Sequence, residues 1–146
     1  MRTTTLRQLV TGDGTAVLTG ADVPVSGVSY RSDRVRPGDA FFCIPGFRHD
    51  GHDFAAEAVG RGAVALVCER AVALPVPQVL VADARRALAT AAAIAYGDPT
   101  EQMSVVGVTG TNGKTTTTYL IDSILRTAGR TTGLIGTVET RIGATR

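Results

Sequence analysis

The first part of the chain alternates short apolar runs with polar turns. Each run is only a few residues long and rich in Val, Ala, Leu or Phe, a pattern typical of largely buried strands. The turns between the runs collect Gly, Pro, Asp and Ser, which interrupt regular structure. The pattern predicts strands at 16–19, 27–30, 40–44, 63–67 and 76–82.

Two segments between these runs place apolar residues at helical spacing and predict helices at 52–62 and 83–97. Asp53 and Asp83 are the expected N-caps, because an Asp carboxylate accepts hydrogen bonds from N–H groups of the first turn. Glycines at positions 60, 62 and 97 are expected to end the helices. The expected buried faces are Phe54, Ala55, Ala58 and Val59 in the first helix and Leu88, Ala91, Ala92 and Ala95 in the second. The order of strand, helix and strand predicts an α/β fold with mostly parallel strands.

The stretch AYGDPTEQ at 95–102 collects Gly, Asp, Pro and Thr after a long alanine-rich run. Such a change in composition is typical of a domain boundary. We therefore expect one domain at 1–99 and a second at 100–146. A length of 146 residues allows one complete domain and part of another.

The second part of the chain begins with an apolar run at 104–110, which predicts a short buried strand. A helix is predicted at 118–129 and a further buried strand at 131–138. The expected buried stripe of this helix is Tyr119, Ile121, Leu125 and Ala128, with Gly129 at its end. Two strands and one helix do not complete a parallel sheet, so we expect only the truncated start of a second domain with a parallel sheet.

Composition narrows the class of protein. Hydrophobic residues make up 44% and charged residues 19% of the chain, the balance of a soluble globular protein rather than a disordered one. Fifteen Lys and Arg against thirteen Asp and Glu leave a formal net charge of +2, so no nucleic-acid partner is expected. No apolar run approaches the roughly 20 residues that a membrane span needs. Because the N-terminus also lacks the apolar stretch of a secretory signal, we expect no membrane insertion and a cytoplasmic location.

The cysteine and histidine positions predict neither disulfide bonds nor a metal site. Cys43 and Cys68 lie inside apolar stretches and are too few for a disulfide scaffold, so both are expected to be reduced core residues. His49 and His52 flank Asp50, an arrangement that suggests a metal site. Because the turn offers no further ligands, we expect exposed loop histidines and no metal.

The strongest candidate for chemistry is GVTGTNGKTTTT at 107–118, where a predicted strand passes into a helix. A phosphate-binding loop needs glycines whose N–H groups approach phosphate oxygens, a Lys that neutralises charge, and a hydroxyl for Mg²⁺. The positive end of the helix dipole adds to the same point. The expected nucleotide-binding residues are Gly110, Thr111, Asn112, Gly113, Lys114, Thr115 and Thr116, with Thr115 as the Mg²⁺ ligand.

This loop departs from the GxxxxGK[ST] pattern, because Val108 stands where the first Gly belongs. A turn made only of turn-forming residues, with no ligand, is the alternative interpretation. Four consecutive threonines at 115–118 are poor helix formers, which indicates that hydroxyl groups are wanted in the first turn. For Thr117 and Thr118 we expect capping and packing instead.

GVTGTNGKTTTT followed by GLIGTV at 133–138 resembles the ATP-binding segment of the Mur ligases. Upstream, residues 34–67 are similar to the uridine-binding N-terminal domain of the Mur ligases that add the third residue and the terminal dipeptide of the peptidoglycan stem. Thr111 and the GLIGT segment favour the members that add the third residue. The resemblance spans nearly the whole chain, and its two parts occur in the expected order.

The resemblance implies an ATP-dependent ligase that acts on UDP-N-acetylmuramoyl-L-alanyl-D-glutamate and a diamino acid, either meso-diaminopimelate or L-lysine. In this family ATP converts a free carboxylate into an acyl phosphate, and the incoming amino group then displaces phosphate. Lys114 is the expected catalytic residue, because it would stabilise charge on the transferring phosphoryl group. Thr115 would help to hold Mg²⁺.

In this family the sequence Asp-Ser-Arg usually precedes a turn of the N-terminal domain, and its Ser contacts the nucleotide part of the substrate. Here the three residues are Arg31, Ser32 and Asp33, so Ser32 alone keeps the family position and the expected substrate-binding role. For Arg31 and Arg34, contact with the diphosphate and a solvated loop both stay open. Three further residues match a family turn and are expected to set its backbone shape: Gly46, Asp50 and Gly51.

Mur ligases are longer than this chain, which lacks their later central-domain segments and their C-terminal domain. We therefore expect a fragment that is inactive alone and does not hold ATP tightly, because its sheet lacks neighbouring strands. Three alternatives stay open: a stand-alone UDP-sugar-binding module without catalysis, the related dipeptide-adding ligase, and a generic P-loop nucleotide hydrolase.

Overall fold

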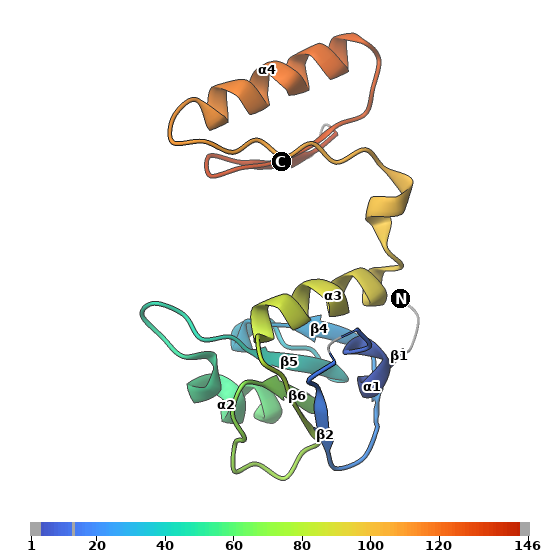
Figure 1. The fold of residues 1–146 in the computed structure, drawn as a ribbon, viewed down its shortest axis with the longest axis vertical. Coiled ribbons are helices and arrows are strands. Elements are labelled where there is room, and N and C mark those ends of the chain that lie inside the picture. The colour runs from blue at the N-terminus through green and yellow to red at the C-terminus, as the bar shows by residue number, and fades with distance from the viewer. Residues whose placement is uncertain (1–3, 13, 144–146) are drawn as a thin grey trace. The chain divides into compact units, whose positions relative to one another are not determined.

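The computed structural model describes residues 4–12 and 14–143, in two compact units (Figure 1). The first unit is Met1–Met103 and the second is Ser104–Arg146. This division falls shortly after the boundary expected between positions 99 and 100, and the domain limits themselves stay a prediction.

The first unit is built on a five-stranded sheet with the order β2-β7-β6-β5-β4. Strands β4 to β7 run parallel, and β2 pairs antiparallel with β7 at one edge. The strands are β2 Val17–Thr19, β4 Gly27–Ser29, β5 Asp39–Cys43, β6 Ala65–Cys68 and β7 Gln78–Leu80. A separate two-stranded ladder joins β1 Thr4–Thr5 to β3 Pro24–Val25. The five predicted strands are present, and the α/β class with mostly parallel strands is confirmed for this unit.

Helices cover both faces of this sheet (Figure 1). On one face lie α1 Leu6–Leu9 and α3 Ala84–Tyr96, and on the other lies α2 Ala55–Gly60. The unit also contains three short 3-10 helices, η1 Ser32–Arg34, η2 Gly51–Phe54 and η3 Pro99–Gln102. Successive side chains of β5 and β6 alternate between the faces, as strand geometry requires. Ala40, Phe42, Ala65 and Val67 pack with α1 and α3, whereas Phe41, Cys43, Leu66 and Cys68 pack with α2. Because both faces are covered, these strands appear in the sequence as continuous apolar runs.

Helix α3 begins and ends where the sequence predicts. The carboxylate of Asp83 accepts a hydrogen bond from the N–H of Arg86 at 2.9 Å, and Gly97 adopts a φ of 74° at the C-terminal end. The buried residues of α3 are Ala84, Ala87, Ala91 and Ala95. The predicted face is therefore confirmed for Ala91 and Ala95, while Leu88 and Ala92 are half-buried.

The N-cap predicted at Asp53 is wrong. The 3-10 helix η2 precedes α2, and Asp50 caps it by accepting a hydrogen bond from the N–H of His52 at 2.9 Å. The chain therefore begins to coil three residues before the predicted cap, where Gly51 allows a tight return from β5. Of the expected buried face, Ala55 and Ala58 are buried and Val59 is half-buried, but the prediction is wrong for Phe54, which is exposed.

The second unit consists of α4 Lys114–Thr127 and a hairpin of β8 Gly133–Ile135 with β9 Thr140–Ile142. Strands β8 and β9 pair antiparallel, and the strands that would complete the expected parallel sheet are not among the described residues. The buried strand predicted at 104–110 is wrong: residues 104–107 are exposed, and no described strand pairs with them. A strand forms only where a neighbouring strand accepts its backbone hydrogen bonds.

The helix of the second unit starts at Lys114, before the predicted position 118. Of the stripe expected to be buried, Tyr119 and Ile121 are half-buried, and the prediction is wrong for Leu125 and Ala128, which are exposed. The described residues that are buried in this unit are Asp122 and Leu134. The short hairpin covers only part of the helix face, which explains the difference.

Candidate functional site

The loop at 110–113 turns the chain directly into α4. Gly110 and Gly113 have φ values of 147° and 77°, which glycine adopts without strain. Gly113 is the N-cap residue, and no side chain caps the helix from that position. A glycine-rich turn into a helix N-terminus leaves the first N–H groups to an external acceptor.

The first-turn amides of α4 have few partners within the chain. The N–H of Thr117 donates to the carbonyl of Gly113 at 2.9 Å. Among the residues that the structure describes, none accepts a hydrogen bond from the N–H of Lys114, Thr115 or Thr116. Four side chains of this segment are exposed: Thr111, Asn112, Thr115 and Thr116. The donors and the helix dipole together suit an anion.

Lys114 closes the loop on itself. Its Nζ donates to the carbonyl of Gly110 and to that of Thr111, the latter at 3.3 Å. The hydroxyl of Thr118 donates to the carbonyl of Lys114 at 2.8 Å, which agrees with the packing role expected for Thr118. An anion at the helix N-terminus would compete with the two carbonyls for the ammonium group.

Ser32 opens η1, three residues after the end of β4. The residue is half-buried, and in the described part of the chain its hydroxyl has no hydrogen-bond partner. Its neighbours pair with each other: Arg31 donates to both carboxylate oxygens of Asp33, at 3.0 and 2.8 Å. Hydrogen bonding from Arg31 lowers the pKa of Asp33. Arg31 and Asp33, which stand in the reverse of the family order, thus form an exposed ion pair on either side of Ser32 in the sequence.

A loop leaves the sheet after β5 and returns at Gly51. Backbone hydrogen bonds close its base, from the N–H of Gly51 to the carbonyl of Ile44 and from the N–H of Gly46 to the carbonyl of His49, both at 3.0 Å. A Cβ on Gly51 would lie 2.4 Å from the nitrogen of Ile44, and one on Gly46 would lie 2.8 Å from the oxygen of His49. Both glycines are therefore required by space, as expected from the sequence.

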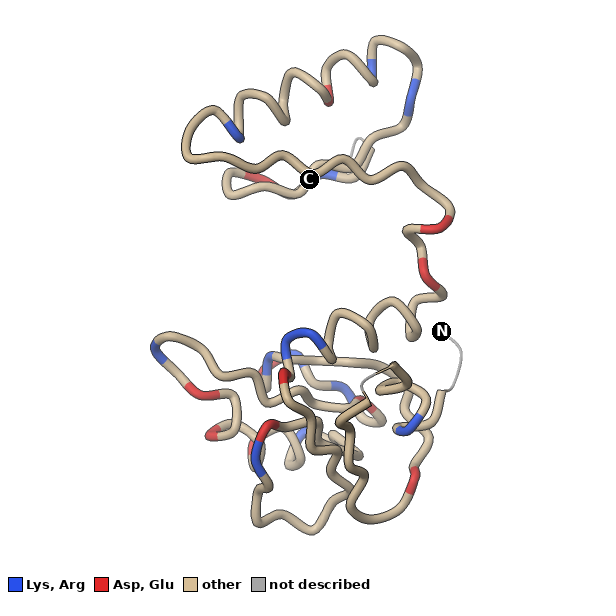
Figure 2. Tube along the Cα trace, in the orientation of Figure 1, with Lys and Arg blue, Asp and Glu red and all other residues tan. Residues whose placement is uncertain are grey.

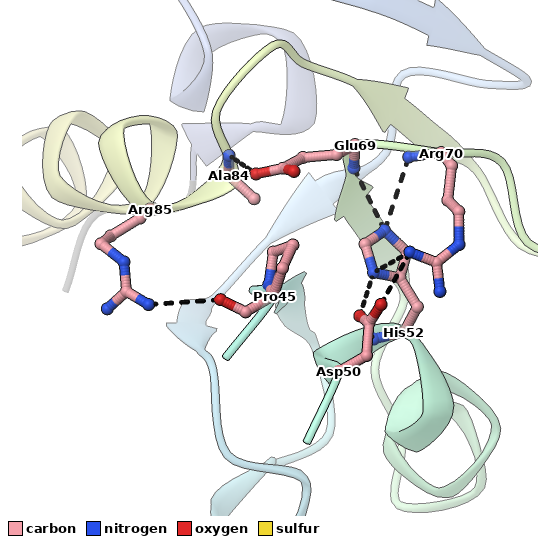
Figure 3. Close-up of polar contacts among 7 residues, drawn as sticks. All are labelled: Pro45, Asp50, His52, Glu69, Arg70, Ala84 and Arg85. Carbon is pink, nitrogen blue, oxygen red and sulfur yellow. Dashed lines mark hydrogen bonds and ion pairs between the residues drawn. The ribbon is translucent and has the colours of Figure 1, made fainter. Parts of the chain in front are cut away.

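His52 is the residue that sequence reasoning missed, because it is buried rather than exposed (Figure 3). Its Nε2 lies 3.2 Å from the N–H nitrogen of Glu69 and 3.5 Å from that of Arg70, both just beyond β6. Its Nδ1 lies 2.6 Å from the carboxylate of Asp50. Arg70 also donates to Asp50, at 2.7 Å. The signal in the sequence was an Asp-Gly-His step between two buried strands.

The partners of His52 define its protonation. Because two backbone N–H groups point at Nε2, this nitrogen is an acceptor, and the proton resides on Nδ1 and is donated to Asp50. The carboxylate of Asp50 accepts hydrogen bonds from the backbone and the ring of His52 and from Arg70, and these hold its pKa well below the usual range. The pair is a neutral imidazole and a charged carboxylate.

Cys43 and Cys68 are free and buried, as expected for core residues. No group of three or more His, Cys, Asp or Glu in the described ranges is arranged to hold a metal ion. None of the helices in those ranges has the length and apolar character needed to cross a membrane. Basic and acidic positions are interspersed along each unit (Figure 2).

Both units match models of known protein families. Residues 24–113 match the Mur ligase family, catalytic domain, and residues 108–146 match the Mur ligase middle domain. The first match alone covers more than half of the chain.

Individual relatives agree with the family match. The chain is 52% identical over 124 residues to UDP-N-acetylmuramoyl-L-alanyl-D-glutamate--2,6-diaminopimelate ligase of Geobacillus thermodenitrificans, covering 85% of this chain and 25% of the relative. It is 54% identical over 112 residues to the enzyme of the same name from Halalkalibacterium halodurans, covering 77% and 23%. Among solved structures, MurF ligase from Thermotoga maritima in complex with ADP is 37% identical, with a TM-score of 0.53, over 68% of this chain and 23% of that one. The chain spans about a quarter of the length of these relatives.

Proposed function

Because the chain belongs to the Mur ligase family, we propose that it is the N-terminal part of a cytoplasmic, ATP-dependent ligase of peptidoglycan precursor synthesis. The proposed reaction adds 2,6-diaminopimelate, as the third amino acid, to UDP-N-acetylmuramoyl-L-alanyl-D-glutamate. The observation that carries this proposal is the sequence identity of 52% and 54%, over most of the chain, to two relatives named for that reaction. In the proposed division of labour, residues 1–99 bind the UDP-sugar and residues 100–146 begin the ATP site.

The residues at the start of α4 are suited to binding a nucleoside triphosphate. The N–H groups of Lys114, Thr115 and Thr116 have no described acceptor, and Gly110 and Gly113 place no Cβ beside them. The likeness of the chain to a ligase structure that contains ADP supports the same assignment. The proposed nucleotide-binding set is Gly110, Thr111, Asn112, Gly113, Lys114, Thr115 and Thr116.

The chemistry that MgATP supplies in such a reaction is the phosphoryl group that activates a carboxylate. For the chain itself, the proposed task of Lys114 is to move its ammonium from the carbonyls of Gly110 and Thr111 onto phosphate oxygens and offset their charge. The proposed task of the exposed Thr115 hydroxyl is to help hold Mg²⁺. Backbone N–H groups of the first turn would orient the phosphates.

The proposed UDP-sugar site lies at the carboxyl edge of the parallel sheet, where Ser32 follows β4. Ligands of open α/β sheets bind outside the carboxyl ends of the strands. The unpartnered hydroxyl of Ser32 has the donor and acceptor capacity to orient a nucleotide there. A guanidinium contact with the diphosphate is better suited to Arg34, because Asp33 already occupies the Nε and Nη2 groups of Arg31.

Isothermal titration of the 146-residue chain tests the proposal. We expect UDP-N-acetylmuramoyl-L-alanyl-D-glutamate to bind at least about tenfold more tightly than ADP-glucose, a difference of about 1.4 kcal/mol. Binding of MgATP is expected to be weak, because few groups beyond the loop contribute. Equal affinity for the two nucleotide sugars, or no heat with either, would overturn the UDP-sugar assignment. ATP hydrolysis by a chain indifferent to UDP-sugars would favour a generic P-loop hydrolase instead.

The dipeptide-adding ligase is the second candidate, and the structure of MurF with ADP favours it. Its identity to this chain, 37%, is well below the 52% of the diaminopimelate-adding relative. The two candidates differ in substrate length, since the dipeptide-adding reaction consumes a UDP-linked tripeptide. Titration with the UDP-linked dipeptide and tripeptide therefore separates them, and tighter binding of the dipeptide form is expected.

A further inference from the structure

The Asp50–His52 cluster lies at the same edge of the sheet as the proposed UDP-sugar site. Strands β4 and β5 are neighbouring and parallel, so the segments that follow them emerge side by side. Ser32 follows β4, and the loop at 44–50 follows β5. The end of β6, with Glu69 and Arg70, is the next position along this edge.

The loop at 44–50 presents side chains that the chain itself does not cover. Phe47 is fully exposed, and Arg48 and His49 beside it are exposed as well. An aromatic ring and a cation in a loop at the carboxyl edge of a parallel sheet are suited to a nucleotide. Such a loop binds well only if its conformation is fixed before the ligand arrives.

The base of this loop is held from three sides (Figure 3). Pro45 and Asp50 form an isolated antiparallel bridge across it. The guanidinium of Arg85, on α3, donates to the carbonyl of Pro45 at 3.4 Å. On the returning side of the loop, the carboxylate of Asp50 is held by the ring of His52 at 2.6 Å and by Arg70 at 2.7 Å.

His52 connects this base to the rigid part of the unit. Its ring is almost completely buried, and Nε2 accepts from the backbone N–H of Glu69 at the end of β6. The side chain of Glu69 in turn accepts from the N–H of Ala84 at 2.9 Å, at the start of α3. The imidazole therefore links the loop to the end of a central strand, and Glu69 links that strand end to the helix that packs on the sheet.

We propose that His52 is a positioning residue of the UDP-sugar site. Through the carboxylate of Asp50 it holds the loop at 44–50 in the conformation that meets the nucleotide sugar beside Ser32. This inference rests on the proposed function, and it assigns to His52 no contact with the ligand. The ring must be a neutral imidazole for this purpose, because only then does it accept at Nε2 and donate at Nδ1.

Binding of UDP-N-acetylmuramoyl-L-alanyl-D-glutamate to variants of the full chain tests this inference. His52→Phe keeps a buried ring but removes both ring nitrogens, whereas His52→Gln keeps one donor and one acceptor. If the loop holds its binding conformation in only a tenth of the molecules, the apparent Kd rises about tenfold. We expect that rise or a larger one for His52→Phe, and a Kd within about threefold of the parent for His52→Gln. The matched control is Arg61→Gln, at the exposed end of α2, which is expected to leave the Kd unchanged.

Hydrogen exchange separates positioning from general stability. The N–H groups of Gly46 and Gly51 are bonded within the base of the loop, and in His52→Phe they are expected to exchange about tenfold faster, while amides of β5 and β6 keep their protection. Equal loss of protection across the sheet, or unchanged exchange at both glycines, would overturn the inference. Asp50→Ala removes the acceptor and so breaks the same link from the other side, and it decides the question if His52→Phe does not fold.

Failure of the inference and failure of the proposed function give different results. A parent chain that does not bind the UDP-linked dipeptide contradicts the proposed function. A parent chain that binds it, together with folded His52→Phe and Asp50→Ala variants that bind equally well, contradicts only the role of His52.

Discussion

Gly51 lies so close to the backbone of Ile44 that a Cβ on Gly51 would stand 2.4 Å from the Ile44 nitrogen and 2.7 Å from its oxygen. The same two residues are joined by a hydrogen bond of 3.0 Å from the N–H of Gly51 to the carbonyl of Ile44. The absent side chain is therefore what lets the loop return onto the end of β5. Because backbone atoms are in the way, no rotamer change relieves the contact.

Gly51→Ala is expected to destabilise the first unit by about 1–3 kcal/mol, the range typical of overpacking. Gly60→Ala is the matched control, since nothing lies within 4 Å of a Cβ at that position on α2. The control is expected to keep or raise stability, by up to about 1 kcal/mol, because Ala favours a helix. Urea unfolding followed by circular dichroism measures both. Equal free energies of unfolding for the two variants would contradict the close approach.

Alanine substitution of two phenylalanines five residues apart is expected to change the free energy of unfolding by very different amounts. Phe42 is fully buried on the face of β5 that packs against α1 and α3, whereas Phe47 is fully exposed in the loop. Phe42→Ala is expected to cost about 3–5 kcal/mol, because it removes buried area and leaves a cavity. Phe47→Ala is expected to change the free energy of unfolding by less than about 0.5 kcal/mol. The same denaturation experiment checks both, and similar losses would contradict the assignment of β5 to the core.

The first unit was predictable because its signals are local. Each strand covered on both faces appears as an apolar run, and the cap at Asp83 and the stop at Gly97 lie next to the helix they limit. The cluster at Asp50 was not predictable in this way. His52 meets N–H groups 17 and 18 residues further along the chain, so only the pairing of β5 with β6 brings them together.

The second unit shows the limit of apolar patterns. The run at 104–110 has the composition of a buried strand, yet the described residues provide no strand to pair with it. A pattern predicts which residues prefer burial, but burial itself requires a partner surface. The glycine-rich turn and the helix after Gly113 follow the sequence more closely, because backbone freedom and helix initiation are decided within a few residues.

The buried cysteines are expected to be unreactive in the folded chain. Burial, and then the neighbouring thiol of Cys68, raises the pKa of Cys43 to about 12, and burial raises the pKa of Cys68 to about 11. Since the thiolate is the reactive species, labelling with iodoacetamide at pH 8 should be negligible under native conditions. In guanidinium chloride both thiols should react, which serves as the control. Rapid stoichiometric labelling of the native chain, measured by mass spectrometry, would contradict the burial of the strand ends.

In the second unit, the largely buried Asp122 holds the hairpin to α4. Its carboxylate accepts from the hydroxyl of Thr132 at 2.6 Å and from the guanidinium of Arg141. Arg141→Met removes the guanidinium that pairs with this carboxylate, which weakens the attachment of the hairpin to α4. The variant is therefore expected to lose protection of α4 while β5 and β6 keep theirs. Hydrogen exchange measures this, and Arg130→Met, at an exposed position just after α4, is the control expected to keep it. Unchanged protection in the Arg141 variant would show that the ion pair does not hold the unit.

The lowered pKa of Asp50 is expected to make the stability of the first unit depend on pH. The pKa of Asp50 is lowered in the folded chain by hydrogen bonds from the backbone and ring of His52 and then from Arg70. A carboxyl group whose pKa is lower in the folded state than in the unfolded chain stabilises the fold above its unfolded pKa of about 3.9. This contribution is lost as the pH falls through the lower folded pKa. Relative to Asp50→Asn, the parent is therefore expected to be more stable by a constant amount between about pH 5 and 7, and to lose that advantage below about pH 4. Urea unfolding at a series of pH values compares the two proteins. Curves that stay parallel down to the acid limit would mean that Asp50 is not held by these partners in the folded chain.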